Sequence, residues 1–314
     1  MTHSVVTGGA GFIGSHIATA LSRMPDSQVT VIDNLLTGCR KNMDGFLSRA
    51  AWIDADITDT ARLRDVFQGV DCVFHQAALP SVPRSIENPL DSNWNNINGT
   101  LSVLTAARDC GVRRVVFASS SSVYGMEPRL PKIESLPTIP KSPYALTKLA
   151  GEHYCRLFFE IYGLETVALR YFNVFGPRQN PASQYAAVVP IFIMRLLTGQ
   201  PVIIHGDGNQ SRDFTFVDNV VHANLLASKA PDAAGKVYNI GCGHRLSINE
   251  LFDTIRQLTG STAKPSHIPE RTGDIRHSLA DIEAARRDLG YEPHVSVIAG
   301  LEQTVAYYAS SAAA

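Results

Sequence analysis

Short apolar runs and longer amphipathic stretches alternate along the first half of the chain. The runs are rich in Val, Ile and Phe and end at polar or glycine-rich positions, a pattern typical of strands that are buried on both faces. The expected strands are SVVTG at 4–8, VTVID at 29–33, AWIDAD at 51–56, DCVFHQA at 71–77, RRVVFAS at 113–119 and ETVALRYFN at 165–173. Strands that alternate with helices predict a parallel sheet with helices on both faces.

Helical periodicity fills the intervals between these strands and recurs in the second half. The expected helices span about 13–23, 89–110, 142–162 and 217–228. After residue 175 the signals become short and are interrupted by Gly and Pro, beginning with the loop GPRQNPASQ. We therefore expect an α/β protein with a doubly wound parallel sheet in residues 1–175, to which part of 215–245 returns. Residues 176–314 would form mainly a smaller mixed α/β lobe.

The composition limits the kinds of binding partner and the cellular location that can be expected. The 314 residues carry 28 Lys and Arg against 29 Asp and Glu, so the formal net charge of -1 gives no reason to expect nucleic acid or an acidic membrane surface. The five cysteines are widely spaced without a C-x-x-C pair, which argues against a disulfide framework or a metal site. The first residues lack a cationic leader region, and no window reaches the roughly 18 apolar residues of a membrane span. These features favour a cytoplasmic protein.

A glycine-rich turn follows the first expected strand. Gly8, Gly11 and Gly14 are spaced G-x-x-G-x-x-G between a strand and a helix, where the chain can approach a pyrophosphate at the helix N-terminus. Asp33 ends the second strand about 20 residues further on, and its carboxylate suits the ribose hydroxyls of NAD while it would repel the extra phosphate of NADP. The further candidate contacts are Phe12, Ile13, Asn34, Asp56 and Ile57. The alternative is a glycine turn beside an unrelated acid.

The segment YALTK places Tyr144 and Lys148 four residues apart, on one face of the helix expected at 142–162. A phenol normally titrates near pH 10, and a lysine ammonium together with a cationic nicotinamide would favour the phenolate. Tyr144 is therefore a candidate base for a sugar or alcohol hydroxyl. A packed tyrosine beside a solvated lysine would give the same pattern, but the preceding Ser-Pro helix start and the dinucleotide motif favour a functional pair.

Taken together, the motifs resemble extended short-chain dehydrogenases/reductases of the nucleotide-sugar epimerase type, and in detail bacterial UDP-N-acetylglucosamine 4-epimerases. The matching segments are TGGAGFIGSH, VIDNL, HQAA, NINGT, SSSSVYG, SPYALTK, RYFNVFGPRQ, GDGNQSRDF and RTGDIRHSLAD, which span residues 5–281. The resemblance implies a Rossmann-type domain with NAD as a tightly held cofactor. It also implies a homodimer built on the helices around 89–110 and 142–162.

The resemblance further implies a reaction cycle. Tyr144 would take the proton of the sugar 4-hydroxyl, assisted by Lys148, while a hydride leaves C4 for NAD. The 4-keto sugar would then turn about its phosphate link and receive the hydride on its other face, which inverts C4. The family contacts to NAD would also include Gln76, Ala77, Ala78, Asn95, Ser119 and Tyr171.

The run SSSSVYG distinguishes between reactions of this family. By resemblance, Ser120 hydrogen-bonds the 4-hydroxyl and assists Tyr144. Dehydratase relatives carry Asp and Glu where this chain has Ser121 and Ser122, and those carboxyl groups expel water from the sugar. Hydroxyl groups are poor proton shuttles for that elimination, so the sequence favours simple epimerisation. The alternative for Ser119 and Ser122 is that they merely end a strand.

The resemblance also supplies the residues expected to hold a UDP-sugar. Arg212 and Arg271 would bind the diphosphate through their guanidinium groups. The other expected substrate contacts are Arg84, Ser85, Ser120, Ser121, Ser122, Tyr144, Asn173, Ala187, Val188, His205 and Asp274, with Ala187 and Val188 in the uridine-lining segment 184–190. His205 would stack on uracil, although a purely structural histidine fits equally well.

Ser278 bears on the identity of the sugar. It matches a gate beside the sugar 2-position, which is a bulky tyrosine in relatives restricted to glucose and galactose. A serine leaves room for an N-acetyl group, so UDP-N-acetylglucosamine is the expected substrate, with UDP-glucose also accepted. Two alternatives remain open: Arg84 could instead receive the carboxylate of a UDP-uronate, or the chain could be an NAD-binding regulatory protein without catalysis.

Overall fold

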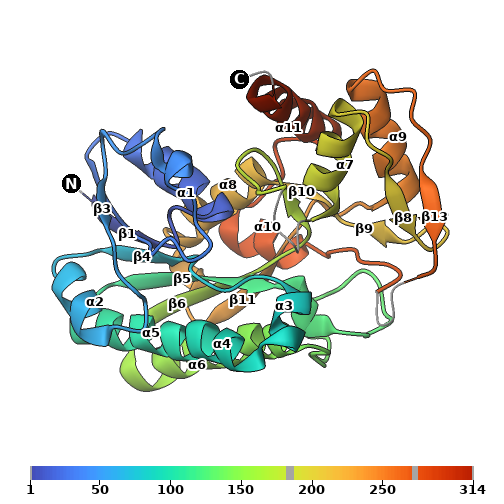
Figure 1. The fold of residues 1–314 in the computed structure, drawn as a ribbon. Coiled ribbons are helices and arrows are strands. Elements are labelled where there is room, and N and C mark those ends of the chain that lie inside the picture. The colour runs from blue at the N-terminus through green and yellow to red at the C-terminus, as the bar shows by residue number, and fades with distance from the viewer. Residues whose placement is uncertain (1, 182–186, 271–274, 313–314) are drawn as a thin grey trace.

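A computed structural model describes residues 2–181, 187–270 and 275–312 of the chain. A seven-stranded, all-parallel sheet forms its centre, in the order β11-β6-β5-β4-β1-β2-β3 (Figure 1). The strands are β1 (Thr2–Thr7), β2 (Ser27–Ile32), β3 (Ala51–Ile53), β4 (Cys72–His75), β5 (Arg114–Ser120), β6 (Glu165–Tyr171) and β11 (Lys236–Ile240). The chain turns back between β1 and β4, and such a switch point opens a crevice at the carboxyl ends of the strands.

Helices cover both faces of the sheet, as the alternating pattern predicts. One face carries α1 (Phe12–Ser22), α8 (Val217–Ala227) and α10 (Glu283–Leu289), and the other carries α2 (Thr60–Val66), α5 (Gly99–Asp109) and α6 (Pro143–Tyr162). Successive strand residues serve the two faces in turn: Val6 packs in the core under α1 and α8, whereas Val5 packs in the core under α5 and α6. The doubly wound α/β fold expected from the sequence is confirmed.

A second group of elements lies beyond the carboxyl end of the sheet, on the right in Figure 1. Its helices are α7 (Val188–Leu197), α9 (Ile248–Leu258) and α11 (Val297–Ala312), which share a separate apolar core. Its short strands pair as β7 (Val174–Phe175) with β10 (Thr215–Phe216), β8 (Ile203–His205) with β13 (Ser266–Ile268), and β9 (Ser211–Arg212) with β12 (Leu246–Ser247). The remaining elements are α3 (Val82–Glu87), α4 (Pro89–Asn93) and helical turns at Arg40–Met43, Trp94–Asn98, Ser121–Tyr124 and Pro231–Ala233.

Three details differ from the sequence-based expectation. The helix expected at 89–110 consists of α4 and α5 joined by a π-helical turn at Trp94–Asn98. The strand expected at 51–56 is only the three residues of β3. The seventh strand, β11, was not expected, because its run KVYNI is short and starts with an exposed lysine.

The start of α6 follows directly from the sequence and matters for the site. The Ser142 side chain caps the helix by accepting a hydrogen bond from the Ala145 amide at 3.1 Å, and Pro143 occupies the first helical position. Gly163, in the left-handed conformation, ends the helix at φ 70°. Within residues 2–181, 187–270 and 275–312, no helix is both long and apolar enough to span a membrane.

Candidate active site

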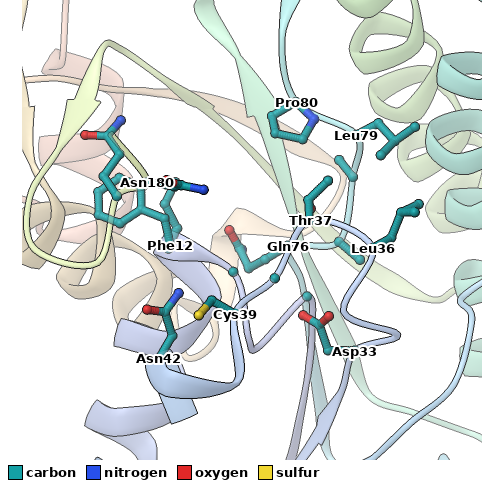
Figure 2. Close-up of a pocket in the computed structure, with 18 of the residues that line it drawn as sticks. Phe12, Asp33, Leu36, Thr37, Cys39, Asn42, Gln76, Leu79, Pro80 and Asn180 are labelled. Atoms are coloured by element: carbon teal, nitrogen blue, oxygen red, sulfur yellow. The ribbon is translucent and has the colours of Figure 1, made fainter. Parts of the chain in front are cut away.

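A cavity of about 970 Å³ opens at the carboxyl ends of the central strands. Figure 2 shows Phe12, Asp33 and Gln76 on different segments around it. The predicted cofactor residues that line the cavity are Gly8, Gly11, Phe12, Ile13, Gly14, Asp33, Asn34, Ile57, Gln76, Ala77, Ala78, Asn95, Ser119, Tyr144, Lys148 and Tyr171. The cavity therefore brings together predicted cofactor residues from eight separate segments of the chain.

The glycine turn is built for close backbone approach. Gly8 has φ 70°, and a Cβ there would lie 2.7 Å from the Ala77 backbone. A Cβ on Gly14 would lie 2.2 Å from the Gly8 carbonyl oxygen. Gly11 caps α1 without any side-chain hydrogen bond, so the first amides of the helix remain open toward the cavity. This arrangement fits an anionic pyrophosphate at the helix N-terminus.

Asp33 is held as an acceptor at the end of β2. Its carboxylate accepts hydrogen bonds from the amides of Ala10 at 2.9 Å and Leu35 at 2.8 Å. Burial raises the pKa of this carboxyl, and backbone donors at Leu35, Ala10 and Gly11 oppose that rise. Asp33 can therefore receive ribose hydroxyls at the cavity wall, and its neighbours fit the adenosine half of NAD.

Asp56 is engaged in hydrogen bonds with neighbouring loops. Its carboxylate accepts from the amide of Thr58 at 2.8 Å and from the Asn34 side chain at 3.0 Å. Asp56 does not line the cavity, whereas its neighbour Ile57 does. Asp56 therefore joins two loops beside the cavity, and its predicted contact with the cofactor stays a prediction.

Tyr144 and Lys148 line the cavity from one face of α6. Lys148 Nζ donates to the Ala118 carbonyl at 2.8 Å, and burial lowers the pKa of this amine to about 8. Burial raises the pKa of the Tyr144 phenol, while a hydrogen bond with Ser120 lowers it. The expectation that Lys148 and a cationic nicotinamide together favour the phenolate stays a prediction. Lys148 Nζ lies 6.0 Å from the Tyr144 ring centroid, and desolvation dominates.

The four serines do not share one role. Ser120 points to Tyr144, and its oxygen also accepts from the Ser122 hydroxyl at 2.9 Å. Ser121 and Ser122 start the helical turn after β5 and are partly exposed. The Ser119 hydroxyl donates to the buried carboxylate of Glu152, and the residue lines the cavity, so its contact with the cofactor stays a prediction.

Glu152 belongs to a buried polar network that the sequence analysis missed. Its carboxylate receives Arg170 through two bonds, at 2.9 and 2.7 Å, and both side chains are almost fully buried. The Arg170 guanidinium also donates to the Tyr124 hydroxyl at 2.8 Å. The sequence spacing could have indicated Glu152. Tyr144, Lys148 and Glu152 follow one another at four-residue intervals and so share one face of α6.

Two predicted side chains, those of Asn95 and Ser85, form hydrogen bonds within their own helical segments. Asn96, rather than Asn95, holds the active-site backbone, since it bonds the amide of Leu79 at 2.7 Å and the Thr147 hydroxyl at 3.0 Å. The Asn95 side chain donates to Asp91 within its own helix, although Asn95 lines the cavity. Ser85 is fully buried and its hydroxyl donates to Val82, so it does not reach the cavity as expected.

A cluster of uncharged polar side chains also lies beside the cavity. The Tyr171 phenol hydrogen-bonds with Asn224 at 2.8 Å and with Gln76 at 3.3 Å, and burial raises its pKa to about 12. His75 lies between the hydroxyls of Thr7 and Thr100, and burial lowers its pKa to about 3, which keeps the ring neutral. Asn224 of α8 was missed because a single polar position in an apolar helix carries no distinguishing pattern.

The predicted substrate residues fall into two groups. Arg84 and Ala187 line the cavity, and Val188 is the first residue of α7. The main-chain carbonyl of His205, at the end of β8, accepts from Gln210 at 2.7 Å. Arg271, Asp274 and residues 184–186 lie outside the described residues.

Asn173, Arg212 and Ser278 form the other group and converge around residues 211–213. The Asn173 amide donates to the Asp213 carbonyl at 3.2 Å. The Ser278 amide donates to the Ser211 carbonyl at 3.0 Å. Further residues line the cavity without having been predicted: Thr37, Lys41, Asn42, Arg178, Gln179, Tyr307 and Tyr308.

Known proteins are similar to this chain along almost its whole length. The sequence pattern of the NAD dependent epimerase/dehydratase family matches residues 4–241. The UDP-glucose 4-epimerase of Mycolicibacterium smegmatis is 39% identical over 97% of this chain and 98% of its own length.

Two solved structures extend the comparison. The UDP-N-acetylglucosamine 4-epimerase of Methanobrevibacter ruminantium, in complex with UDP-N-acetylmuramic acid, is 43% identical with a TM-score of 0.94 and covers 99% of both chains. The UDP-glucuronic acid 4-epimerase of Bacillus cereus, with UDP-glucuronic acid and NAD, is 33% identical with a TM-score of 0.91 over 99% of this chain and 100% of that one. The chain therefore belongs to the NAD dependent epimerase/dehydratase family and is a nucleotide-sugar 4-epimerase, an isomerase.

Proposed function

We propose that this protein interconverts UDP-N-acetylglucosamine and UDP-N-acetylgalactosamine, and also UDP-glucose and UDP-galactose, by inversion at C4. The observation that carries the proposal is the joint placement of Tyr144 and Lys148 on the wall of the cavity that the glycine turn and Asp33 also line. A proton acceptor thus lies within the same enclosure as a dinucleotide site.

Different residues of the chain bind the cofactor and transfer the proton. The glycine turn and the N-terminus of α1 hold the cofactor diphosphate, and Asp33 holds its adenosine ribose. Bound NAD supplies a hydride acceptor that is regenerated in each turnover. Tyr144 takes the 4-hydroxyl proton, Ser120 orients that hydroxyl, and the Lys148 ammonium favours the phenolate. Neutral His75 adds no competing positive charge beneath Lys148.

Two features support an acetylated sugar and a simple epimerisation. Ser278 is a small, partly buried residue where a bulky side chain would close the space beside the sugar 2-position. The relative from M. ruminantium binds a sugar nucleotide that carries a 2-acetamido group, UDP-N-acetylmuramic acid. Ser121 and Ser122 offer no carboxyl group for elimination of water. Arg212, with Arg271, is the proposed diphosphate ligand, and Asn173 is a proposed contact to the sugar or diphosphate.

The test is a direct assay of the purified protein with separate UDP-N-acetylglucosamine and UDP-glucose, without added NAD. Proton NMR reports the configuration at C4. Conversion of both sugars is the expected result. Conversion of UDP-glucose alone would contradict our interpretation of Ser278, and no conversion of either sugar after NAD addition would contradict the proposal.

A uronate substrate is the second candidate, and Arg84 is the observation that favours it. Arg84 lines the cavity from α3, where a guanidinium can receive a carboxylate at C6. The B. cereus relative acts on UDP-glucuronic acid. Activity confined to UDP-glucuronate, or release of carbon dioxide from it, would select this candidate.

We also propose a homodimer. The surface of α6 opposite Tyr144 and Lys148 carries Leu146, Leu157 and Ile161, which are 55%, 45% and 64% exposed. Leu90 on neighbouring α4 is 80% exposed. Apolar side chains in one stripe on adjacent helices support an interface between two copies of the chain.

A further inference from the structure

Asp213 is a fully buried acid in the second lobe whose side chain bonds only backbone amides among the described residues. One carboxylate oxygen accepts from the Cys242 amide at 2.8 Å. The other accepts from the amides of Gly243 and Ala280, both at 3.1 Å. A charged acceptor with three backbone donors holds those segments strongly, because each charge-assisted bond exceeds a neutral one.

The glycines of the neighbouring turn allow the backbone to pack closely against the Asp213 carboxylate. A Cβ on Gly241 would lie 2.9 Å from the Asp213 carboxylate and 2.6 Å from the Ala280 side chain. Gly243 has φ 72°, a conformation that other residues rarely adopt. The Gly-Cys-Gly turn after β11 therefore wraps around the carboxylate of Asp213.

The segments that Asp213 joins are those that carry the proposed substrate contacts. Arg212 is its chain neighbour, and the Asn173 amide donates to its main-chain carbonyl at 3.2 Å. Ala280 follows Ser278 by two residues, and the Ser278 amide bonds Ser211 at 3.0 Å. One buried carboxylate thus fixes where the diphosphate residue lies relative to the residue beside the sugar.

We propose that Asp213 is a positioning residue for substrate binding, which holds Arg212 and the Ser278 segment in the arrangement that receives the diphosphate and the sugar. The inference rests on the proposed function of Arg212 and Ser278. Asp213 does not touch the substrate and acts through the backbone of its neighbours.

Replacement with asparagine would disrupt the arrangement without a change of volume. The carboxamide has one acceptor oxygen, and its NH₂ group would face at least one of the three amide donors. One clamped segment would be released, while the glycine turn, Asp33 and Tyr144 remain in place. The defect should therefore concern the diphosphate and the sugar rather than NAD.

The experiment compares affinities for UMP and UDP in the NAD-loaded protein, because the pair differs by the β-phosphate. We expect Asp213→Asn to weaken UDP binding by about 10-fold or more and UMP binding by less than about 3-fold, given the usual strength of a charge-assisted bond. KM for UDP-N-acetylglucosamine should rise by a similar factor with kcat within about 3-fold. Arg212→Ala should show the same pattern, and the double variant should lose no more than the larger single loss.

Glu134→Gln is the matched control. Glu134 also accepts a backbone amide, that of Asn239 at 2.8 Å, but it belongs to neither segment that Asp213 clamps. It should leave the ratio of UMP and UDP affinities unchanged, even where it lowers the melting temperature. Equal losses of UMP and UDP affinity in Asp213→Asn would overturn the inference, as would additive effects with Arg212→Ala.

A second variant keeps the test decisive if Asp213→Asn does not fold. Gly241→Ala would place a Cβ 2.9 Å from the same carboxylate, and it should also weaken UDP binding more than UMP binding. Wild-type protein that binds UDP no more tightly than UMP would overturn the inference at once. If the wild-type protein binds UDP more tightly than UMP but converts no sugar nucleotide, the proposed function is contradicted. The role of Asp213 in positioning Arg212 can still be tested by the binding experiment.

Discussion

At the scale of single residues, the site depends on a buried phenol whose pKa lies above its ordinary value. Burial raises the Tyr144 pKa, and only the Ser120 hydrogen bond opposes that rise. Formation of the phenolate is therefore expected to need nearby positive charge, from Lys148 while it keeps its proton and from the bound cofactor. Tyr144 and Lys148 are open to separate tests.

Replacement of Tyr144 with Phe removes the proposed base and leaves the ring in place. We expect turnover to fall by about 10²- to 10⁴-fold, the usual range for loss of a general base. NAD should stay bound, because the glycine turn and Asp33 are untouched. The measurement combines an NMR assay with quantification of NAD released by acid. A fully active Tyr144→Phe protein would contradict the mechanism.

The lowered pKa of Lys148 predicts how the turnover rate depends on pH. Its pKa is lowered to about 8, so the ammonium loses its proton as the pH rises past that value. The rate should therefore decline on the alkaline side of about pH 8, since neutral lysine no longer favours the phenolate. Arginine stays charged across this range, so Lys148→Arg should be slower but without that decline. Profiles of kcat from pH 6 to about 10 test this expectation, and identical alkaline limbs in both proteins would contradict it.

At the scale of elements, the sequence indicated most of the scaffold because its signals are local. Buried parallel strands read as apolar runs, and the Ser142-Pro143 start of α6 is visible in the residues themselves. The strand β11 and the Asp213 clamp depend on partners far along the chain, so no local pattern reveals them. The hydrogen bonds of the Ser119 and Asn95 side chains could not be predicted for a related reason: a motif gives a position on the backbone, and the direction of the side chain depends on partners such as Glu152 and the Asp91 carbonyl.

The close packing of the glycine turn against α1 can be tested by adding one methyl group at Gly14. Gly14→Ala would place a Cβ 2.2 Å from the Gly8 carbonyl oxygen, which forces α1 away from the turn. We expect the purified variant to retain little NAD and to be inactive without added cofactor. Gly69→Ala is the control, because Gly69 also has positive φ but nothing lies within 4 Å of its added Cβ. That control should lose some thermal stability and keep its NAD; a Gly14→Ala protein with full NAD content would contradict the expectation.

The buried pair of Glu152 and Arg170 joins α6 to β6 beneath the catalytic face. Glu152→Gln leaves the Arg170 charge buried without a counter-ion, which typically costs about 3–5 kcal/mol of unfolding free energy. We expect a large drop in melting temperature, followed by circular dichroism. Glu160→Gln removes the exposed partner of Arg156 on the same helix and should leave the melting temperature nearly unchanged. Equal stability of the two variants would contradict a stabilising role for the buried pair.

At the scale of the whole molecule, the helices that carry the site also carry the proposed dimer surface. Leu146, Leu157 and Ile161 recur at helical spacing on the side of α6 away from Tyr144 and Lys148. Figure 1 shows α4, α5 and α6 together along one side of the sheet, opposite α1, α8 and α10. A partner on this surface would support α6 from outside and leave the cavity open at the carboxyl ends of the strands.

Disruption of this surface should separate the subunits. Leu146→Glu with Ile161→Glu places two carboxylates in the apolar stripe, and charges at the centre of an interface are strongly unfavourable. We expect wild-type protein to sediment as a dimer at micromolar concentration and the variant as a monomer that retains NAD. Ile298→Glu on α11 is the control, since Ile298 is 46% exposed but lies on the second lobe. A wild-type monomer would contradict the dimer, and a double variant that remains dimeric would place the interface on another surface.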